Sequence, residues 1–218
     1  MRRLAVFVPL LALVLASAAA GAAERSPRAE KERLNRRDSA LARSVALRKV
    51  DLGRSWTAAR VPKDDGPACK SFSPDLSRFT ITGKAHTMFV DSRGSSVQSV
   101  VEVYASKPHA AGDFLAGARP AQAGCLREAL AHARSEAPKG VMLTFGSARM
   151  VRAPKVGQRA ASYRLVGELG TRGVSFPLYM DLLVVQRGRT IVALFSTGLE
   201  RPVAGQVERA RKLAARMR

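Results

Sequence analysis

The sequence GVSFPLYMDLLVVQRGRTIVALFSTG, from Gly173 to Gly198, indicates how the rest of the chain is arranged. Two apolar runs flank Arg187-Gly188-Arg189, and each run has the length of a β-strand. Gly188 can adopt the positive φ of a tight turn, and the two arginines keep that turn in water. The segment therefore predicts an antiparallel hairpin.

Side chains of the first strand in this hairpin alternate between two faces of a sheet. One face carries Phe176, Leu178, Met180, Leu182 and Val184, and the other carries Tyr179, Asp181, Leu183 and Val185. Because both faces are largely apolar, we expect a central strand rather than an edge strand. Pro177 lacks a backbone donor, so it should lie at a strand end, a bulge or an unpaired position.

Four further segments have the composition of strands. Residues 80–91 and 97–106 predict a second hairpin, and residues 141–151 and 160–169 predict two more strands. Gly146 is expected at a bulge in the first of these last two. Together with the hairpin at 173–198, they give a central antiparallel sheet of about six strands.

Helical spacing recurs in the segments between and around these strands. We expect a short helix to residue 45 capped by Asp38-Ser39, a helix at 110–117 capped by Ser106, and a third helix at 121–135. A last amphipathic helix begins at 199–202, and its small, alanine-rich apolar stripe favours docking on the sheet over binding a membrane surface. The fold class is therefore α+β, with helices packed on the sheet.

The N-terminus has the order of a secretory signal peptide. Met1-Arg2-Arg3 precedes an apolar run, Leu4–Ala16, and then the small residues Ser17–Ala23. The run is shorter than the ~20 residues of a membrane span, which favours cleavage over retention as an anchor. We divide the chain into a signal peptide (1–23), a charged linker (24–38) and a single α+β domain (39–218). After cleavage we expect no integral membrane span and a protein that is secreted or associated with the cell envelope.

Cys69 and Cys125 are the two cysteines of the chain. In an exported protein such a pair favours one intramolecular disulfide. The bridge would close a loop of about 55 residues, for which chain entropy gives ~4 kcal/mol. Free buried thiols and an intermolecular pair are the alternatives.

Charge is the strongest bias in the composition. The formal net charge is +20 and the pI is ≈ 11.4. Removing the segment that holds Arg2 and Arg3 leaves +18. Contact with a polyanion is one interpretation, and a solvated basic surface without a partner is the other. Aromatic residues make up only 6%, so the stacking platform of a single-strand binder is missing.

Motifs for catalysis, metals and cofactors are missing. The sequence contains no G-x-S-x-G, no P-loop, no dinucleotide fingerprint and no histidine pair at metal-ligand spacing. Asp181 is the one charged residue inside the central apolar run. It is interpreted either as a ligand-contacting carboxylate in a cleft or as a cross-strand ion pair with Arg164 or Arg189. His86, in a strand, is either a structural histidine or a site residue.

Several short motifs occur in an order typical of one protein family: Asp51–Trp56, Cys69, Ser99–Tyr104, Cys125, Tyr179–Asp181 and Arg187–Arg189. Between about Leu47 and Leu199 the chain resembles actinobacterial secreted proteins related to the PknH-type extracellular sensor domain. The resemblance implies a central antiparallel sheet with helices, disulfides and a cleft for a ligand, and it implies no catalytic residues. The chain departs from the kinase-linked members in having only two cysteines and no kinase. A PsbP-like α/β sandwich is the related alternative fold.

These observations predict an exported, non-enzymatic ligand-binding or sensor-like module of the cell envelope, without cofactor or metal. Its expected partner is a small ligand or an envelope component, contacted by Tyr179, Asp181 and His86. The alternative is a basic surface protein that binds a polyanion, which could be a wall polymer, an anionic lipid or a nucleic acid. A hydrolase that uses Asp181 or His86 is the third hypothesis.

Overall fold

The computed structural model describes residues 28–61, 69–135, 137, 139–171 and 173–217. The predicted signal peptide at residues 1–23 lies outside this range. So does the first part of the predicted linker.

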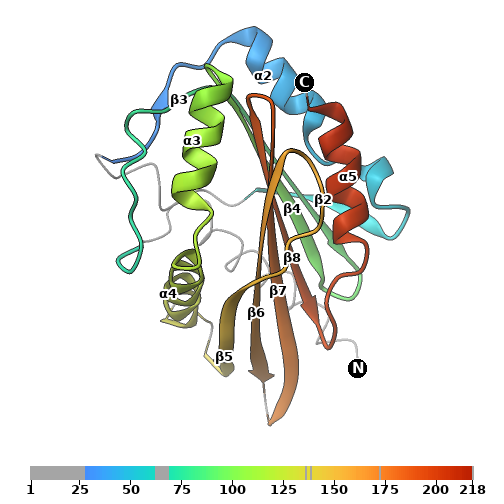
Figure 1. Ribbon diagram of the computed structural model, residues 1–218. Coiled ribbons are helices and arrows are strands. Elements are labelled where there is room, and N and C mark those ends of the chain that lie inside the picture. The colour runs from blue at the N-terminus through green and yellow to red at the C-terminus, as the bar shows by residue number, and fades with distance from the viewer. Residues whose placement is uncertain (1–27, 62–68, 136, 138, 172, 218) are drawn as a thin grey trace.

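Within the described residues, eight strands form one sheet (Figure 1). In chain order they are β1 (Lys31–Glu32), β2 (Trp56–Ala59), β3 (Thr80–Asp91), β4 (Ser96–Tyr104), β5 (Val141–Val151), β6 (Arg159–Thr171), β7 (Val174–Arg187) and β8 (Thr190–Leu199). Across the sheet the order is β1-β3-β4-β8-β7-β6-β5, and β2 also pairs with β3. The six long strands confirm the prediction, whereas β1 and β2 were not expected. Because β1 runs parallel to β3, the sheet is mixed rather than wholly antiparallel.

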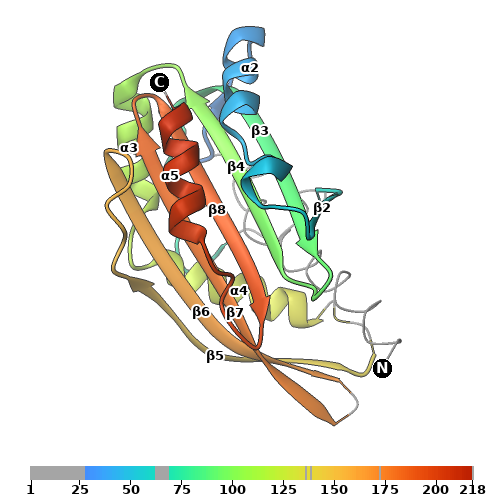
Figure 2. The ribbon, with the colours of Figure 1, turned by 90° about the vertical axis from the view of Figure 1, so that its right-hand side faces the viewer.

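Helices cover both faces of the sheet. They are α2 (Arg36–Val45), the 3-10 turn η1 (Lys49–Asp51), α3 (Lys107–Gly117), α4 (Gln122–Ser135) and α5 (Gln206–Arg216). Turning the molecule places α5 in front of the sheet and α3 behind it (Figure 2). The buried side chains of α2 and α5 share one core cluster, and those of α3 and α4 share the other. The fold is therefore α+β, with the sheet between two helical layers.

The β7–β8 hairpin lies at the centre, as its two apolar faces predicted. Leu182 pairs with Phe195 and Leu183 with Leu194, so consecutive residues face opposite cores. Gly188 has φ 59° in the turn. Pro177 lies inside β7, opposite Glu168 of β6, and not at a strand end or bulge as predicted. The β7–β8 ladder begins only at Leu178, so the missing donor costs no bond to β8.

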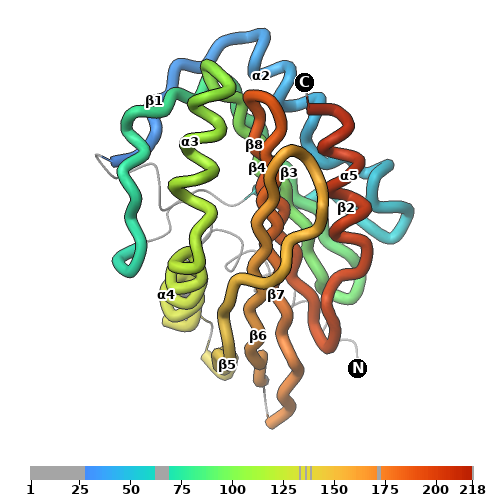
Figure 3. Tube along the Cα trace, in the orientation of Figure 1, coloured from blue at the N-terminus to red at the C-terminus, as the bar shows by residue number. Residues whose placement is uncertain are grey.

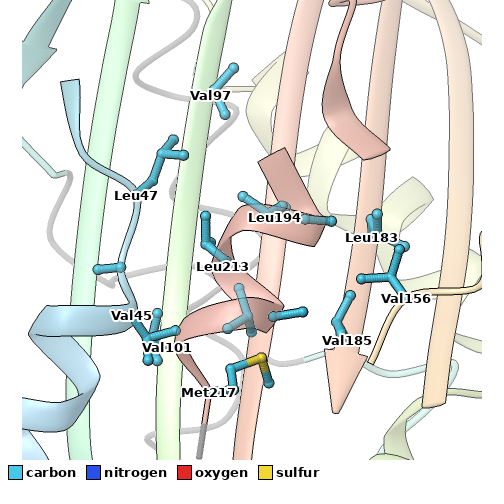
Figure 4. Close-up of a cluster of buried hydrophobic side chains, with 14 of the residues drawn as sticks. Val45, Leu47, Val97, Val101, Val156, Leu183, Val185, Leu194, Leu213 and Met217 are labelled. Atoms are coloured by element: carbon cyan, nitrogen blue, oxygen red, sulfur yellow. The ribbon is translucent and has the colours of Figure 1, made fainter. Parts of the chain in front are cut away.

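The core under α5 is built mainly from aliphatic side chains (Figure 4). Leu183, Val185 and Leu194 of the central hairpin share this core with Leu213 of α5 and with Met217, which directly follows α5. This packing confirms that the last helix docks on the sheet. Each such side chain contributes about 1.5–3 kcal/mol when it is fully buried.

Two predicted helix starts are wrong. Asn35, not Asp38-Ser39, caps α2, since its side-chain oxygen accepts the Asp38 amide at 2.9 Å. The helix thus begins inside the segment that was assigned to the linker. The last helix begins at Gln206 instead of 199–202, because β8 continues to Leu199 and Gly205 turns the chain with φ 78°.

The predicted disulfide is confirmed. Cys69 and Cys125 are bonded, with their Cα atoms 5.2 Å apart, and they join the segment before β3 to α4. The Glu128 carboxylate on α4 accepts the amides of Lys70 and Ser71 at 2.6 and 2.7 Å. Together these bonds hold the incoming segment against the α4 layer.

Candidate functional site

The residues predicted to contact a ligand lie on two different faces of the sheet. Tyr179 and Asp181 share the α5 face of β7, because residues two apart in a strand point the same way. His86 points to the α3–α4 face, where its Nε2 is 3.0 Å from Oε1 of Gln98. Burial lowers the pKa of His86, although the hydrogen bond with Gln98 opposes this shift. The structure thus brings Tyr179 and Asp181 together and separates His86 from both.

Asp181 forms a cross-strand ion pair, which was one of the two interpretations of this residue from the sequence. Arg164 lies directly opposite on β6, and its Nε and Nη2 donate to the two carboxylate oxygens at 2.7 and 3.1 Å. Asp181 also borders a hollow of ≈ 20 Å³, but that hollow lies on the α4 face of the sheet, among Leu126 and Leu130. That volume is close to what one water molecule requires. Ligand contact by these residues stays a prediction.

At one end of the sheet α2, the end of α5 and the β7–β8 turn come together (Figure 3). A far larger hollow lies between these three elements. We call it the basic groove, and its volume is ≈ 730 Å³. Each of the three elements contributes an arginine to it. The lining residues are Arg37, Asp38, Ala40, Leu41, Ser44, Arg189, Ala215 and Arg216.

Arg189, in the β7–β8 turn, is held in the groove by Asp38 of α2. Its guanidinium donates to both carboxylate oxygens of Asp38 and, at 3.1 Å, to the carbonyl of Tyr104. Thr82 donates to the same carboxylate at 2.6 Å. The bonds from Arg189, then those from Thr82 and Asn35, hold the pKa of Asp38 well below its usual range against the opposing effect of burial. This carboxylate is therefore charged at neutral pH and fixes the Arg189 side chain.

Arg216, in the last turn of α5, is held in the same manner by Asp51 of η1. Its guanidinium donates to both carboxylate oxygens, one of them at 3.0 Å. Burial alone would raise the pKa of Asp51, but the bonds from Arg216 and from the Arg48 amide lower it. Two arginines thus enter the groove already oriented, with their charges offset by buried carboxylates.

Further arginines on α2 have no such partner. Within the described residues, no carboxylate pairs with Arg36, Arg37 or Arg43, and all three side chains are exposed. Arg37 lines the basic groove. Arg36 and Arg43 line a second hollow of ≈ 500 Å³ on the other side of Ala40, which lines both hollows. This end of the molecule therefore carries uncompensated positive charge.

Carboxyl groups gather on the other face, beneath α3, and we call them the acid cluster: Glu30, Glu102 and Asp113, with the Tyr104 hydroxyl between them. Tyr104 is fully buried and donates to Glu102 at 3.1 Å. Oδ1 of Asp113 is buried and has no hydrogen-bond partner among the described residues.

The acid cluster has perturbed proton affinities. Burial, then the charge of Glu30, raises the pKa of Glu102 to about 7, although Lys84 lowers it in part. Burial and the nearby Glu30 and Glu102 raise the pKa of Asp113 to about 9. Asp113 is therefore protonated at neutral pH.

The described part of the chain contains neither a metal-binding cluster nor a membrane-spanning helix. No group of three or more histidine, cysteine, aspartate or glutamate side chains there could hold a metal ion. No helix in that part is long and apolar enough to cross a membrane. The two candidates of the hydrolase hypothesis, His86 and Asp181, lie on opposite faces of the sheet.

Sequence reasoning missed the basic groove. Its arginines come from positions 37, 189 and 216, which only the fold brings together. One signal was available, because Arg36, Arg37, Ala40, Arg43 and Ser44 recur at helical spacing on the outer side of α2.

No protein-family model and no curated protein sequence matches the chain. Among solved structures, the chain is similar to the extracellular domain of PknH from Mycobacterium tuberculosis, with 8% identity and a TM-score of 0.42 over 82% of this chain and 93% of that one. It is also similar to an uncharacterized protein, the Rv0999 ortholog from Mycobacterium smegmatis, with 14% identity and a TM-score of 0.33 over 82% and 95%. The first likeness agrees with the resemblance predicted from the sequence. At these identities and TM-scores neither bears on ligand or activity.

Proposed function

We propose that the chain is an exported, non-catalytic recognition module of the cell envelope, and that its ligand occupies the basic groove. The observation that carries this proposal is the groove itself. It offers ≈ 730 Å³ at the meeting point of three elements, and buried carboxylates orient two of its arginines. Side chains that are oriented before binding lose less entropy when a ligand arrives.

Non-catalytic action is supported by the separation of the chemically active candidates. His86 has Gln98 as its partner and Asp181 has Arg164, so neither is placed to activate a nucleophile. Export is supported by the order of charges and apolar residues before Ala23 and fits the disulfide between Cys69 and Cys125.

A ligand screen with a groove-filling variant tests this function. Thermal unfolding of the mature protein would be followed with wall fragments, sugars and lipids extracted from the envelope of the source cell. Ser44→Trp fills the groove from the exposed side of α2. Leu115→Trp introduces the same side chain on α3, at a position that is 50% exposed and on the other face of the sheet.

We expect at least one component to raise the melting temperature of the native protein and of Leu115→Trp, but not that of Ser44→Trp. Equal stabilisation of all three proteins would place the ligand elsewhere. Stabilisation by none of the envelope components would contradict the recognition function.

A further inference from the structure

The composition of the groove narrows the chemistry of its ligand. We infer that the ligand is a linear polymer that carries phosphate groups along its length, an inference that rests on the proposed function. Three features of the basic groove and of the second hollow beside it carry this inference: the excess of arginine over carboxylate, the lining residue Ala40 that both hollows share, and the absence of aromatic side chains from both linings.

The positive charge of the two linings favours an anionic ligand. The two hollows are lined by Arg36, Arg37, Arg43, Arg189 and Arg216. Asp38 and Asp51 offset the last two, and they leave the three arginines of α2 without a carboxylate partner in the described chain. An anion that approaches α2 therefore meets net positive charge in a partly enclosed site, where attraction is stronger than in open water.

The spacing of the arginines over two adjoining hollows favours a ligand that carries several charges. Ala40 lines both hollows, and because its side chain ends at Cβ it adds little bulk between them. Arg36 and Arg43, seven residues apart, lie on the same side of the helix and are separated by ~10 Å along its axis. A single small anion reaches one of these arginines, whereas a chain with repeated charges can pass over Ala40 and contact arginines in both hollows.

The type of cation favours phosphate groups. Every cation in the two linings is an arginine, whose planar fork binds phosphate oxygens in pairs, and Ser44 adds a hydroxyl. A single-stranded nucleic acid would require aromatic side chains for its bases, and neither lining contains one. A non-nucleic phosphate polymer fits this chemistry best.

Ala40 gives a sharp test, because one substitution there alters both hollows. In Ala40→Glu a carboxylate lies three or four residues from Arg36, Arg37 and Arg43 and competes with the ligand for them. Ala40→Lys matches it in length with the opposite charge, and Ala40→Gln matches it without charge. Position 40 is exposed and these residues are good helix formers, so all three variants should keep the native melting temperature.

The probe is inorganic polyphosphate, titrated by calorimetry at several salt concentrations. We expect the native protein to bind it, with an affinity that falls steeply with salt because counterions are released. We expect Ala40→Glu to weaken binding about 10–100-fold relative to Ala40→Gln, and Ala40→Lys to bind at least as tightly as Ala40→Gln. Equal affinities for the Glu and Lys variants would overturn the assignment.

Three further probes separate the alternatives. Free inorganic phosphate that binds as tightly as polyphosphate would contradict a polymer, and poly-glutamate that binds as tightly would contradict the preference for phosphate. Vesicles rich in anionic lipid that bind more tightly would indicate a membrane surface instead. If polyphosphate does not bind while an envelope component still loses its effect in Ser44→Trp, this inference fails and the proposed function stands.

Discussion

The basic groove and the acid cluster hold carboxyl groups in opposite electrostatic surroundings. Asp38, in the groove, and Asp51, beneath Arg216, each accept two bonds from an arginine, and their pKa values are lowered. Beneath α3, Glu102 and Asp113 face Glu30 and each other, and their pKa values are raised. The comparison shows that a net charge of +20 is unevenly distributed. The fold gathers arginine at one end and leaves a buried group of acids with little compensation.

Among substitutions at the basic groove, removal of Arg189, which holds Asp38, should lower the free energy of unfolding most. In Arg189→Met the Asp38 carboxylate stays buried with Thr82 and Asn35 as its remaining partners. Breaking a buried pair on one side costs about 3–5 kcal/mol, and the partial exposure of Arg189 puts this case at about 2–3 kcal/mol. Urea unfolding at pH 7 measures this loss. Arg43→Met is the control, because Arg43 forms no ion pair within the described residues. A loss no larger than that of the control would contradict the structural role of Arg189.

Rising pH should reduce the contribution of the acid cluster to the stability of the folded protein. The pKa values of Glu102 and Asp113 are raised in the folded protein, so the unfolded chain releases their protons first as pH rises. Their contribution is complete below about pH 4 and is lost as pH rises through about 7 for Glu102 and about 9 for Asp113. The slope is at most about 1.4 kcal/mol per pH unit for each group.

Glu102→Gln and Asp113→Asn sharpen this prediction. Urea unfolding between pH 4.5 and 9.5 should show a stability that falls less steeply in each variant than in the native protein. Glu168→Gln, an exposed acid on β6, should leave the slope unchanged. A native profile that stays flat over this range would show that the acids beneath α3 do not interact as described.

The carboxylates at the basic groove should show the opposite pH dependence: their contribution to stability is lost as pH falls, and the effect should be smaller than that of the acid cluster. Because the pKa values of Asp38 and Asp51 are lowered on folding, their contribution is present above about pH 4 and is lost as pH falls through the folded values. In Asp51→Asn the decline of stability below pH 4 should be shallower than in the native protein. Thermal unfolding from pH 5 to pH 2.5 provides the measurement, and an unchanged decline would exclude Asp51 as a source.

The ion pair between Arg164 and Asp181 is expected to have the smallest effect. Its arginine side chain is 42% exposed, so solvent screens the pair. Arg164→Met should cost less than about 1 kcal/mol in urea unfolding at pH 7. A loss as large as that of Arg189→Met would mean that Asp181 depends on its partner as strongly as Asp38 does.

Local patterns predicted the centre of the fold. The alternating apolar residues of 173–198 required a strand buried on both faces, and Gly188 marked the turn. Cys69 and Cys125 had one intramolecular partner each, so their bond followed from the export signal. In contrast, β1 has only two residues in a charged segment, and its pairing depends on the exposed edge of β3 rather than on its own sequence.

The two charged regions could not be predicted, because each gathers residues that are distant in the chain. Arg37, Arg189 and Arg216 meet only after α2 and α5 dock on the sheet. The separation of His86 from Asp181 depends on the pairing of β4 with β8, which places them on opposite faces. Strand parity gave the face of each residue within its own strand, but not the relation between distant strands.

The most direct test of the basic groove as the ligand site is the salt dependence of polyphosphate binding. The double variant Arg37→Gln/Arg43→Gln removes from α2 two charges that have no ion pair within the described chain. Arg127→Gln/Arg134→Gln removes two such charges from α4, on the other face. Each phosphate contact that is lost should lower the slope of log affinity against log salt by about one. We predict a slope lower by about two for the α2 variant and unchanged for the α4 variant. Equal slopes for the two variants would contradict the assignment of the ligand to the basic groove and the second hollow beside it.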